Sequence, residues 1–314
     1  MSRRSRSLRA SILAGLLLLL GLLFPDVAQR LQPVPHPLSP FEQGEQHLRQ
    51  GQLYQAELAF RRALEEPATS NRAAGRLGLL ALIRGDDAAA EEPLRAVVQT
   101  TPEEAVAWAC LGLFHARRGE GEAAVDAWSR SVEQPGPHFL TLGLRGEERY
   151  LQGEMAAARA DFTALLGEGA APEWVAWAHL RLGILDAPGD PSTALAYLQA
   201  AQQPAAGWEG DWFPSPEQLY GRPAGERARR AEELAGLLLS LAGRREPERA
   251  LAIGQMLLGQ MDAAGAAWVL ERAVALAPED VRALAHLGWA HSLAGLELQG
   301  LHELHTALVR APGD

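Results

Sequence analysis

Glycine recurs every 34 residues through the first half of the chain, and this period constrains the possible folds more than any other feature. Two glycine series have this period. The first is Gly44, Gly78, Gly112 and Gly146, and the second is Gly51, Gly85, Gly119 and Gly153. An alanine series has the same period, Ala56, Ala90, Ala124 and Ala158, and so does a series of large apolar residues, Phe60, Leu94, Trp128 and Phe162. Four series in step are very unlikely by chance, so residues 36–173 form four equal blocks.

Each series predicts a structural role. Glycine inside a helical pattern costs roughly 1 kcal/mol relative to alanine, and close approach of a partner helix can offset that cost. The second glycine series, together with Gly295 near the C-terminus, stands where the first helix of a block should end, because glycine adopts the left-handed cap without strain. The alanines then begin a second helix and face the small residue of the first, and the large apolar residues fill the space between repeats. Because no block can bury its apolar face alone, the blocks must stack.

These blocks resemble the tetratricopeptide repeat. Trp108-Ala109-Cys110-Leu111-Gly112 matches the aromatic-x-x-Leu-Gly start of that family, Arg76-Leu77-Gly78 repeats its core, and Pro102 matches its final proline. Two further copies occupy 247–280 and 281–314, and a fifth block near 176–204 is one residue short. The resemblance covers roughly four fifths of the chain. It implies an all-α fold, an α-solenoid of helix-turn-helix repeats wound into a right-handed superhelix.

The N-terminus has the pattern of an export or membrane-anchoring segment. Residues 1–9 are basic, with Arg3, Arg4, Arg6 and Arg9, and residues 12–24 are an unbroken apolar run. An uncleaved anchor over residues 10–25 would be short for a membrane span. A cleaved signal peptide would end best at Ala28, although Asp26 stands where a small residue is preferred. A peripheral role is the third alternative. Both main alternatives place the repeats outside the cytoplasm, as expected for a bacterial, membrane-anchored or exported repeat protein.

The chain therefore divides into five predicted segments. Residues 1–30 form a signal-anchor segment, 31–40 a proline-rich extended linker and 41–204 an array of about five repeats. Residues 205–246 form an irregular aromatic insertion, which includes an extra helix over 227–242, and 247–314 form two C-terminal repeats. Ser39, Pro40 and Glu42 predict a capped helix start, and the stretch 101–104 predicts the same for the third block.

Aromatic residues are concentrated where the period fails. Trp208, Trp212, Phe213 and Tyr220 lie within 13 residues, beside a short predicted helix that starts at Pro216. One interpretation is that these aromatics plug the gap between two stacks. The other is that they form a docking segment, because exposed aromatics are enriched in binding hot spots.

Composition excludes several functional classes. The net charge is −10, and without the four N-terminal arginines it is near −14, which disfavours nucleic acid as a partner. The single cysteine, Cys110, excludes an internal disulfide and most thiolate metal sites. The sequence has no phosphate-cradling loop and no nucleophile elbow. His302 and His305 share a helix face but lack further metal ligands. We therefore predict no catalytic residues, no metal and no cofactor.

In the tetratricopeptide family, ligands bind a concave groove lined by the first helix of each repeat. One face of those helices gives nine candidates for a peptide groove: Leu79, Leu82, Ile83, Leu113, Ala116, Arg117, Glu147, Tyr150 and Leu151. Packing between repeats is the alternative role for each of them. One subgroup of the family clamps chaperone C-terminal carboxylates with lysines and asparagines. Here lysine is absent and the matching places hold Phe41 and Glu45, so a helix or extended peptide with aliphatic side chains fits better.

The leading hypothesis is a non-catalytic, membrane-anchored scaffold whose repeats lie outside the cytoplasm and bind a protein or peptide partner. Such a scaffold would support assembly of a membrane or envelope complex. The alternative is a cleaved, exported repeat domain that acts as a structural or oligomerisation module, or as an accessory subunit of a separate enzyme. Self-association stays open in both.

Overall fold

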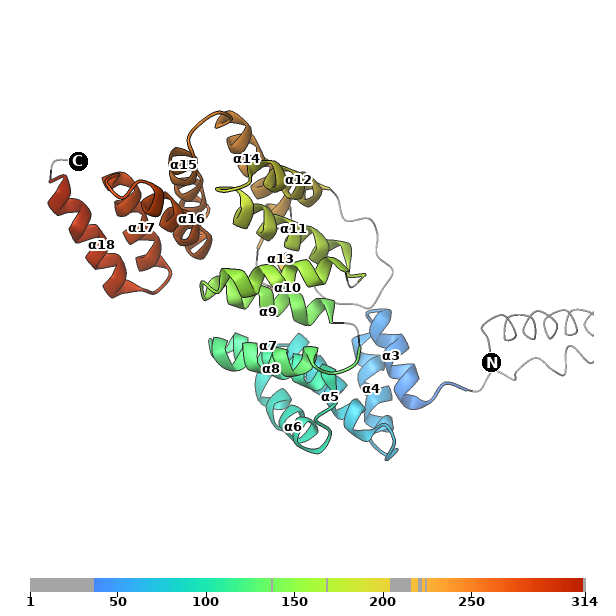
Figure 1. Cartoon of the computed structure of the whole chain (residues 1–314). Coiled ribbons are helices and arrows are strands. Elements are labelled where there is room, and N and C mark those ends of the chain that lie inside the picture. The colour runs from blue at the N-terminus through green and yellow to red at the C-terminus, as the bar shows by residue number, and fades with distance from the viewer. Residues whose placement is uncertain are drawn as a thin grey trace, which may run out of the picture.

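A computed structural model of the chain describes residues 37–136, 138–167, 169–203, 216–219, 222–223 and 225–312. Over these residues the regular structure is helical, without a strand, and the helices follow one another as pairs in a curved row (Figure 1). This confirms the predicted all-α solenoid. The predicted membrane segment, 10–25, and most of the proline-rich linker lie outside the described residues.

The first five pairs are α3 (Pro40–Arg49) with α4 (Leu53–Ala63), α5 (Ser70–Ile83) with α6 (Asp87–Thr100), α7 (Ala105–Arg117) with α8 (Gly121–Val132), α9 (Phe139–Leu151) with α10 (Met155–Gly167), and α11 (Pro172–Asp186) with α12 (Pro191–Gln202). The short α13 (Pro216–Leu219) and the longer α14 (Glu226–Ser240) follow. Two more pairs end the described chain: α15 (Glu246–Gly259) with α16 (Ala263–Leu276), and α17 (Val281–Leu293) with α18 (Glu297–Arg310).

Within a pair, the large apolar residue of the second helix packs on the glycine of the first. A Cβ built on Gly44 would lie 2.5 Å from the Phe60 ring, and one built on Gly112 would collide with the Trp128 indole. The Trp128 Nε1 group also donates a hydrogen bond to the Ala109 carbonyl, at 3.0 Å. The sequence assigned this place to the alanine series, but in the structure the large apolar residue packs on the glycine inside each pair, because the missing Cβ leaves room for its side chain.

The turns inside the pairs use the second glycine series. Gly51 has a φ of 69° and Gly295 a φ of 86°, and Gly85, Gly119 and Gly153 are also left-handed. Each of these glycines lies just after the first helix of its pair. The five predicted helix breaks are confirmed, because a residue with a side chain would be strained in this conformation.

The two predicted helix starts have different outcomes. Ser39 caps α3: its Oγ accepts from the Glu42 amide at 3.3 Å, and the Glu42 carboxylate accepts from the Ser39 amide at 2.8 Å. The start predicted at Thr101 is wrong. The Thr101 amide still donates to the Val97 carbonyl, at 2.7 Å, so Thr101 ends α6, and α7 begins only at Ala105.

The stack has an inner and an outer side. Apart from α12, each second helix with a pair after it packs on the first helix of that pair. Neighbouring first helices also contact one another: α5 with α7, α7 with α9, α9 with α11, and α15 with α17. These additional contacts place the first helices on the inner, more tightly curved side of the solenoid. Among the described helices, none is both long enough and apolar enough to cross a membrane.

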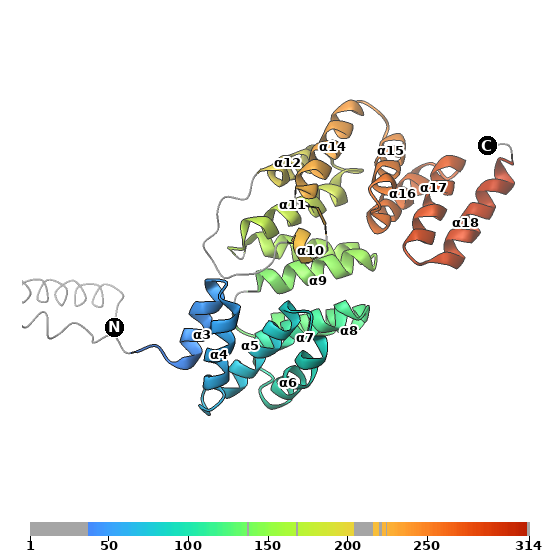
Figure 2. The same ribbon diagram turned by 180° about the vertical axis from the view of Figure 1, so that it is seen from behind.

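The regular stacking changes after α12. α14 packs against α12 and α11, where the first helix of the next pair would stand. The C-terminal pairs then extend away from the earlier ones, as Figure 2 shows from behind. α16 returns to contact α9 and α11. We call the region where α9, α11, α14 and α16 meet the joint.

Candidate functional site

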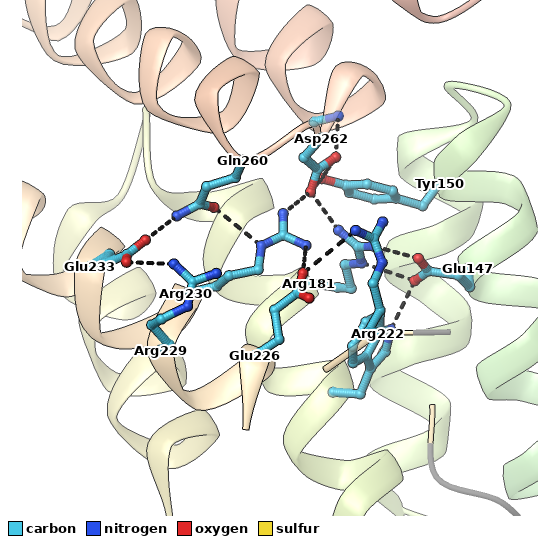
Figure 3. A network of polar contacts seen from close by, with 12 residues as sticks. Glu147, Tyr150, Arg181, Arg222, Glu226, Arg229, Arg230, Glu233, Gln260 and Asp262 are labelled. Carbon is cyan, nitrogen blue, oxygen red and sulfur yellow. Dashed lines mark hydrogen bonds and ion pairs between the residues drawn. The ribbon is translucent and has the colours of Figure 1, made fainter. Parts of the chain in front are cut away.

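Four charged side chains are buried in the joint (Figure 3). They are Glu147 from α9, Arg181 from α11, Arg230 from α14 and Asp262, which caps α16. Their exposed fractions range from 2% to 6%. Two positive and two negative groups cancel, as burial of charge requires, because an unpaired buried ion is very costly.

Arg181 is the central residue of this network. Its Nε donates to Glu147 Oε2 at 2.9 Å, its Nη2 donates to the other oxygen of the same carboxylate, and its Nη1 donates to Asp262 Oδ2 at 2.7 Å. The guanidinium also lies over the Tyr150 ring, 4.1 Å from its centroid. The Trp177 Nε1 group adds a hydrogen bond to Glu147 Oε2, at 2.9 Å. Arg181 thereby joins α9 to the start of α16.

Besides Arg181 of α11, Asp262 has donors from three other helices. Arg230 Nη2 donates to its Oδ2 at 2.6 Å, the Tyr150 hydroxyl donates to its Oδ1 at 3.2 Å, and the Gly265 amide donates to its Oδ1 at 3.1 Å. Burial by itself would raise the pKa of the Asp262 carboxyl, but the Arg181 and Arg230 guanidinium groups hold that pKa below its usual value. Burial and the Asp262 charge raise the pKa of the Tyr150 phenol, which keeps its proton.

The network reaches the surface along α14. Arg230 Nε donates to Gln260 Oε1 at 3.1 Å, and Gln260 Nε2 donates to Glu233 Oε2 at 2.7 Å. Glu226 lies 3.9 Å from Arg230 and 3.5 Å from Arg222. Because the buried charges compensate one another, this arrangement fixes the position of α16 on the inner face of α9 and α11.

The predicted groove residues of the second and third pairs lie mostly inside the packing. Leu79 and Leu82 are buried, Ile83, Leu113 and Ala116 are half-buried, and Arg117 is exposed. Arg117 Nη1 donates to the Leu82 carbonyl at 2.6 Å and lies 3.2 Å from Asp87 Oδ1. These residues therefore come together along α5 and α7, with limited exposed surface.

The fourth pair differs from the second and third. Glu147 and Tyr150 belong to the joint, and Leu151 is exposed. The inner face of α9 therefore already contacts the start of α16, through Asp262. The four predicted docking aromatics, Trp208, Trp212, Phe213 and Tyr220, lie outside the described residues.

The last pair exposes residues that the groove prediction omitted. Trp289 is 52% exposed and Leu293 43% exposed on α17, and both are on its inner side with His286. His286 Nε2 lies 3.2 Å from Gln255 Nε2 of α15. We call His286, Trp289 and Leu293 the α17 inner face. The sequence indicated that Trp289 belongs to the groove positions, because it follows Gly288 as Leu79 follows Gly78 and Leu113 follows Gly112.

The joint was not predicted from the sequence either, although one sequence feature indicated it. On α14, Arg227 and Arg230 stand one turn before Ala231 and Leu234, on the face that becomes buried. An arginine on an apolar helix face predicts a buried acidic partner. The partner of Arg230 is Asp262, which lies in another repeat.

A cleft of about 530 Å³ lies beside the joint. The end of α11 and the turn to α12 form one wall, and α16 forms the other. The lining residues are Leu185, Asp186, Pro188, Gly189 and Asp190 on the first wall and Trp268, Glu271, Arg272 and Ala275 on the second. Hydrogen bonds from Ser192 and Thr193 lower the pKa of Asp190 to about 2, so this wall is anionic near neutral pH. The cleft can receive a side chain of a partner, since it combines an indole with carboxylates.

Cys110 and the late histidines show no sign of chemistry. Cys110 is buried, and burial raises the pKa of its thiol to about 12. His291 is buried, with its Nδ1 2.7 Å from Glu303 Oε2, whereas His302 and His305 are exposed. Within the described residues, no group of three or more potential ligands is arranged to hold a metal ion.

Comparison with known proteins found matches only among solved structures. No family model matches the chain, and no curated protein matches its sequence. The Cut9-Hcn1 hetero-tetramer of the APC/C matches at 13% identity and a TM-score of 0.42, over 91% of this chain and 48% of that chain. This chain thus spans about half the length of that first match.

Two bacterial structures are also similar. Pseudomonas aeruginosa PilF matches at 17% identity and a TM-score of 0.38, over 78% of this chain and 93% of that chain. A tetratricopeptide repeat protein from Parabacteroides merdae ATCC 43184 matches at 14% identity and a TM-score of 0.37, over 87% and 92%. The fold is established by the sequence and the helix packing of this chain itself. The 34-residue period, the helix pairs and the packing of large apolar side chains on glycines give the chain an α-solenoid fold of tetratricopeptide type.

Proposed function

We infer that the protein is a non-catalytic scaffold that binds a protein partner, with the α17 inner face as the main contact. The observation that carries this inference is the exposure of Trp289 beside Leu293 on the inner side of the last pair. Exposed apolar surface costs about 25 cal/mol per Å², and tryptophan is the residue type most enriched in binding hot spots. An inner-face tryptophan left half in water is therefore best explained by a partner that covers it.

The surroundings of Trp289 favour one class of ligand. Leu293 follows Trp289 by one helical turn, and His286 precedes it by three residues, so apolar and polar contacts alternate along α17. Gln255 of α15, close to His286, extends the polar side. An amphipathic helix with aliphatic anchors at one-turn spacing would match this face. Leu113, Arg117 and Leu151 remain candidates for further contacts with a longer peptide.

The location of the scaffold is a proposal from the sequence. Arg3, Arg4, Arg6 and Arg9 precede the apolar run, which favours cytoplasmic retention of the N-terminus and an extracytoplasmic body. In that arrangement the repeats would support assembly of a membrane or envelope complex. The alternative is release after signal cleavage, as an exported structural module or an accessory subunit of a separate enzyme.

The binding proposal is tested with Trp289→Ala in the full-length chain. Crosslinked complexes of wild type, Trp289→Ala and the control Leu239→Ala are purified, and their partners are quantified by mass spectrometry. Leu239 is a suitable control because it is 63% exposed and lies on α14, outside the α17 inner face. We expect a partner that wild type and Leu239→Ala retain and that Trp289→Ala loses at least about 10-fold. Equal recovery by all three proteins would contradict the proposal.

The location proposal is tested separately. A reporter enzyme that is active only outside the cytoplasm, fused after Asp314, should be active. The mass of the mature N-terminus then separates the two alternatives, because signal cleavage removes about 28 residues and an anchor removes none. Activity of a cytoplasm-only reporter at the same position would reverse the topology.

A further inference from the structure

The cleft beside the joint lies between two parts of the solenoid that are far apart in the sequence. The end of α11 and the turn to α12 provide one wall, and one face of α16 provides the other. Its volume of about 530 Å³ is within the range of sites that hold a ligand. Arg249 of α15 donates two hydrogen bonds to the Pro188 carbonyl, from Nη2 at 2.7 Å and from Nε at 3.3 Å. Because these bonds fix the turn relative to α15, the cleft is formed before a ligand enters.

Trp268 stands at a position where the stacking of repeats requires no aromatic residue. It precedes by two residues Leu270, the side chain of α16 that packs on a glycine of α15. The residues two positions before the equivalent side chains of α6, α8 and α10 are all exposed, and they are Glu92, Asp126 and Ala160. The Trp268 indole is itself 39% exposed, and it lines the cleft. The packing of the repeat therefore does not account for this indole, whereas a ligand in the cleft would.

Two of the charged residues that line the cleft are neutralised by neighbours outside it. Arg272 Nε donates to Glu246 Oε1 at 2.8 Å, and Asp186 Oδ2 accepts from Arg159 Nη1 at 3.2 Å. Each pair contributes no net charge, so the charge that a ligand would meet comes from the two remaining carboxylates of the lining.

These two carboxylates, Asp190 and Glu271, have no arginine partner among the described residues. Hydrogen bonds from two hydroxyl groups of α12 lower the pKa of the Asp190 carboxyl to about 2. The Glu271 side chain is 51% exposed and lies 3.5 Å from His291 Nε2, while His291 Nδ1 lies 2.7 Å from Glu303. One imidazole cannot cancel two carboxylates, so an excess of negative charge remains at the cleft.

An aromatic ring beside two carboxylates is the environment that the joint provides for an arginine. There the Arg181 guanidinium lies 4.1 Å from the centroid of the Tyr150 ring and donates to Glu147 and Asp262. A guanidinium is planar, so it can stack on an aromatic ring while its edge donates to carboxylates. The ammonium group of lysine lacks this fork, and an aliphatic side chain would leave both carboxylates of the cleft without a partner.

We propose that this cleft binds an arginine side chain of a basic protein partner, with the guanidinium stacked on Trp268 and paired with Asp190 and Glu271. The net charge of the chain, −10, also favours the approach of a basic partner. One arginine forms few contacts, so a short peptide that contains it should bind with a dissociation constant of about 0.1–1 mM. Further contacts would come from the rest of the partner.

The first test measures binding of the peptide acetyl-Gly-Arg-Gly-amide to the full-length chain in detergent, labelled with fluorotryptophan. The fluorine NMR signal of Trp268 is identified by its absence in Trp268→Phe. We expect the peptide to shift this signal saturably, with a midpoint at about 0.1–1 mM. Peptides with citrulline or leucine in place of arginine should bind at least about 10-fold more weakly, because they lack the charge. Equal binding of either peptide, or no saturable shift up to about 10 mM, would overturn the proposal.

The second test removes the two charges and preserves the shape of the side chains. Asparagine caps a helix as well as aspartate does, so Asp190→Asn should leave α12 intact, and Glu271→Gln alters an exposed residue. We expect the double variant to bind the arginine peptide at least about 10-fold more weakly than wild type. Asp126→Asn, at the position of α8 equivalent to Trp268, is the control and should stay within about 2-fold. Unchanged affinity in the double variant would overturn the proposal.

The third test locates the peptide by photocrosslinking with acetyl-Gly-Arg-benzoylphenylalanine-amide. We expect mass spectrometry to find the label on residues 185–190 or 268–275, and an excess of the arginine peptide, but not of the citrulline peptide, should suppress it. Trp268→Ala should reduce this labelling at least about 10-fold, and Trp268→Phe should reduce it less, because a smaller aromatic ring remains. Urea unfolding checks that both variants are folded. Labelling confined to other parts of the chain, or unchanged by Trp268→Ala, would overturn the proposal.

This site does not depend on the ligand proposed for the α17 inner face. Trp289→Ala should leave binding and labelling by the arginine peptides unchanged, because Trp289 does not line the cleft. Failure of the α17 proposal would appear as equal partner recovery by wild type and Trp289→Ala, whereas failure of the cleft proposal would appear in the peptide measurements. The two proposals can therefore fail independently.

Discussion

The first three helix pairs and the joint are held together by different kinds of contact. In the pairs, a glycine of the first helix receives a large apolar side chain of the second, as Gly112 receives Trp128. In the joint, Arg181 and Arg230 hold Asp262, and Arg181 also holds Glu147. The first kind of contact joins residues 16 positions apart, whereas Tyr150 and Asp262 are 112 positions apart.

The difference teaches where a solenoid can change direction. Glycine-to-apolar contacts propagate a stack because every block repeats them and each block contacts only its neighbours. A buried ion network has no such repeat and demands a defined geometry from all of its members. In this chain the network occurs where the C-terminal pairs leave the regular stack. The joint therefore fixes one orientation of those pairs, which an apolar contact would determine less strictly.

The largest expected effect comes from breaking the network at its centre. Arg181→Ala removes both hydrogen bonds that Arg181 donates to Glu147 and one that Asp262 accepts, and it leaves the buried Glu147 carboxylate without a cationic partner. Losing one member of a buried ion pair costs about 3–5 kcal/mol. Unfolding in urea should show this loss, and hydrogen exchange should accelerate first at the start of α16.

An exposed pair provides the matched control for Arg181. Arg95 and Glu91 lie 2.9 Å apart on the surface of α6. Arg95→Ala should change the free energy of unfolding by at most about 0.5 kcal/mol, because solvent screens such pairs. If Arg181→Ala and Arg95→Ala had similar effects, the buried network would not hold the joint together.

The next effect concerns the pH dependence of the joint. The pKa of Asp262 is lowered in the folded protein, so the unfolded chain binds the proton more tightly. The stabilisation from ionised Asp262 is therefore complete above the ordinary aspartate pKa of about 3.9, and it is lost as the pH falls through the lowered value. Asp262→Asn lacks this titration.

Comparison of wild type with Asp262→Asn isolates the contribution of the Asp262 carboxyl group. The free energy of unfolding of wild type should exceed that of Asp262→Asn at pH 7, and the difference should shrink below about pH 4. Asp126→Asn, at an exposed carboxylate of α8, serves as the control and should stay close to wild type throughout. A difference that stays constant down to about pH 2 would exclude the proposed ionisation of Asp262.

A smaller effect is expected inside the regular pairs. Gly112→Leu would overlap the Trp128 ring, so the α7–α8 contact must open. Overpacking of this kind costs about 1–3 kcal/mol. Thermal unfolding of Gly112→Leu measures the loss, and an unchanged midpoint would show that α8 can move away without cost.

These two kinds of contact also explain what could be predicted from the sequence. The helix pairs, the turn glycines such as Gly51 and the cap at Ser39 follow from local or periodic signals, and the structure contains them. The Thr101 start failed because the chain turns through residues 102–104 before α7 begins. A capping pattern in sequence does not determine which residue ends the preceding helix.

The candidate site was less accessible to prediction for a physical reason. Glu147 and Tyr150 do lie on the inner side of α9, as the helical register requires. The group that faces them there, Asp262, belongs to another repeat, and a 34-residue period carries no information about such a contact. Trp289 was within reach of prediction, because its position in the last block is periodic. The role of the aromatic insertion stays a prediction.

The smallest expected effect separates glycines that the packing requires from those that it does not. Gly236 lies inside α14, is exposed, and has no atom within 4 Å of a built Cβ. Gly236→Ala should therefore stabilise the protein by about 0.5–1 kcal/mol, because alanine restricts the unfolded chain and favours the helix. Gly112→Ala should do the opposite, since even one methyl group overlaps the Trp128 indole. Thermal unfolding of both variants gives the comparison directly. If both changes stabilised the protein, helix propensity alone would govern these positions, and the close approach of α8 to α7 would have no energetic importance. If both destabilised it, α14 would be packed more tightly than its exposed side indicates.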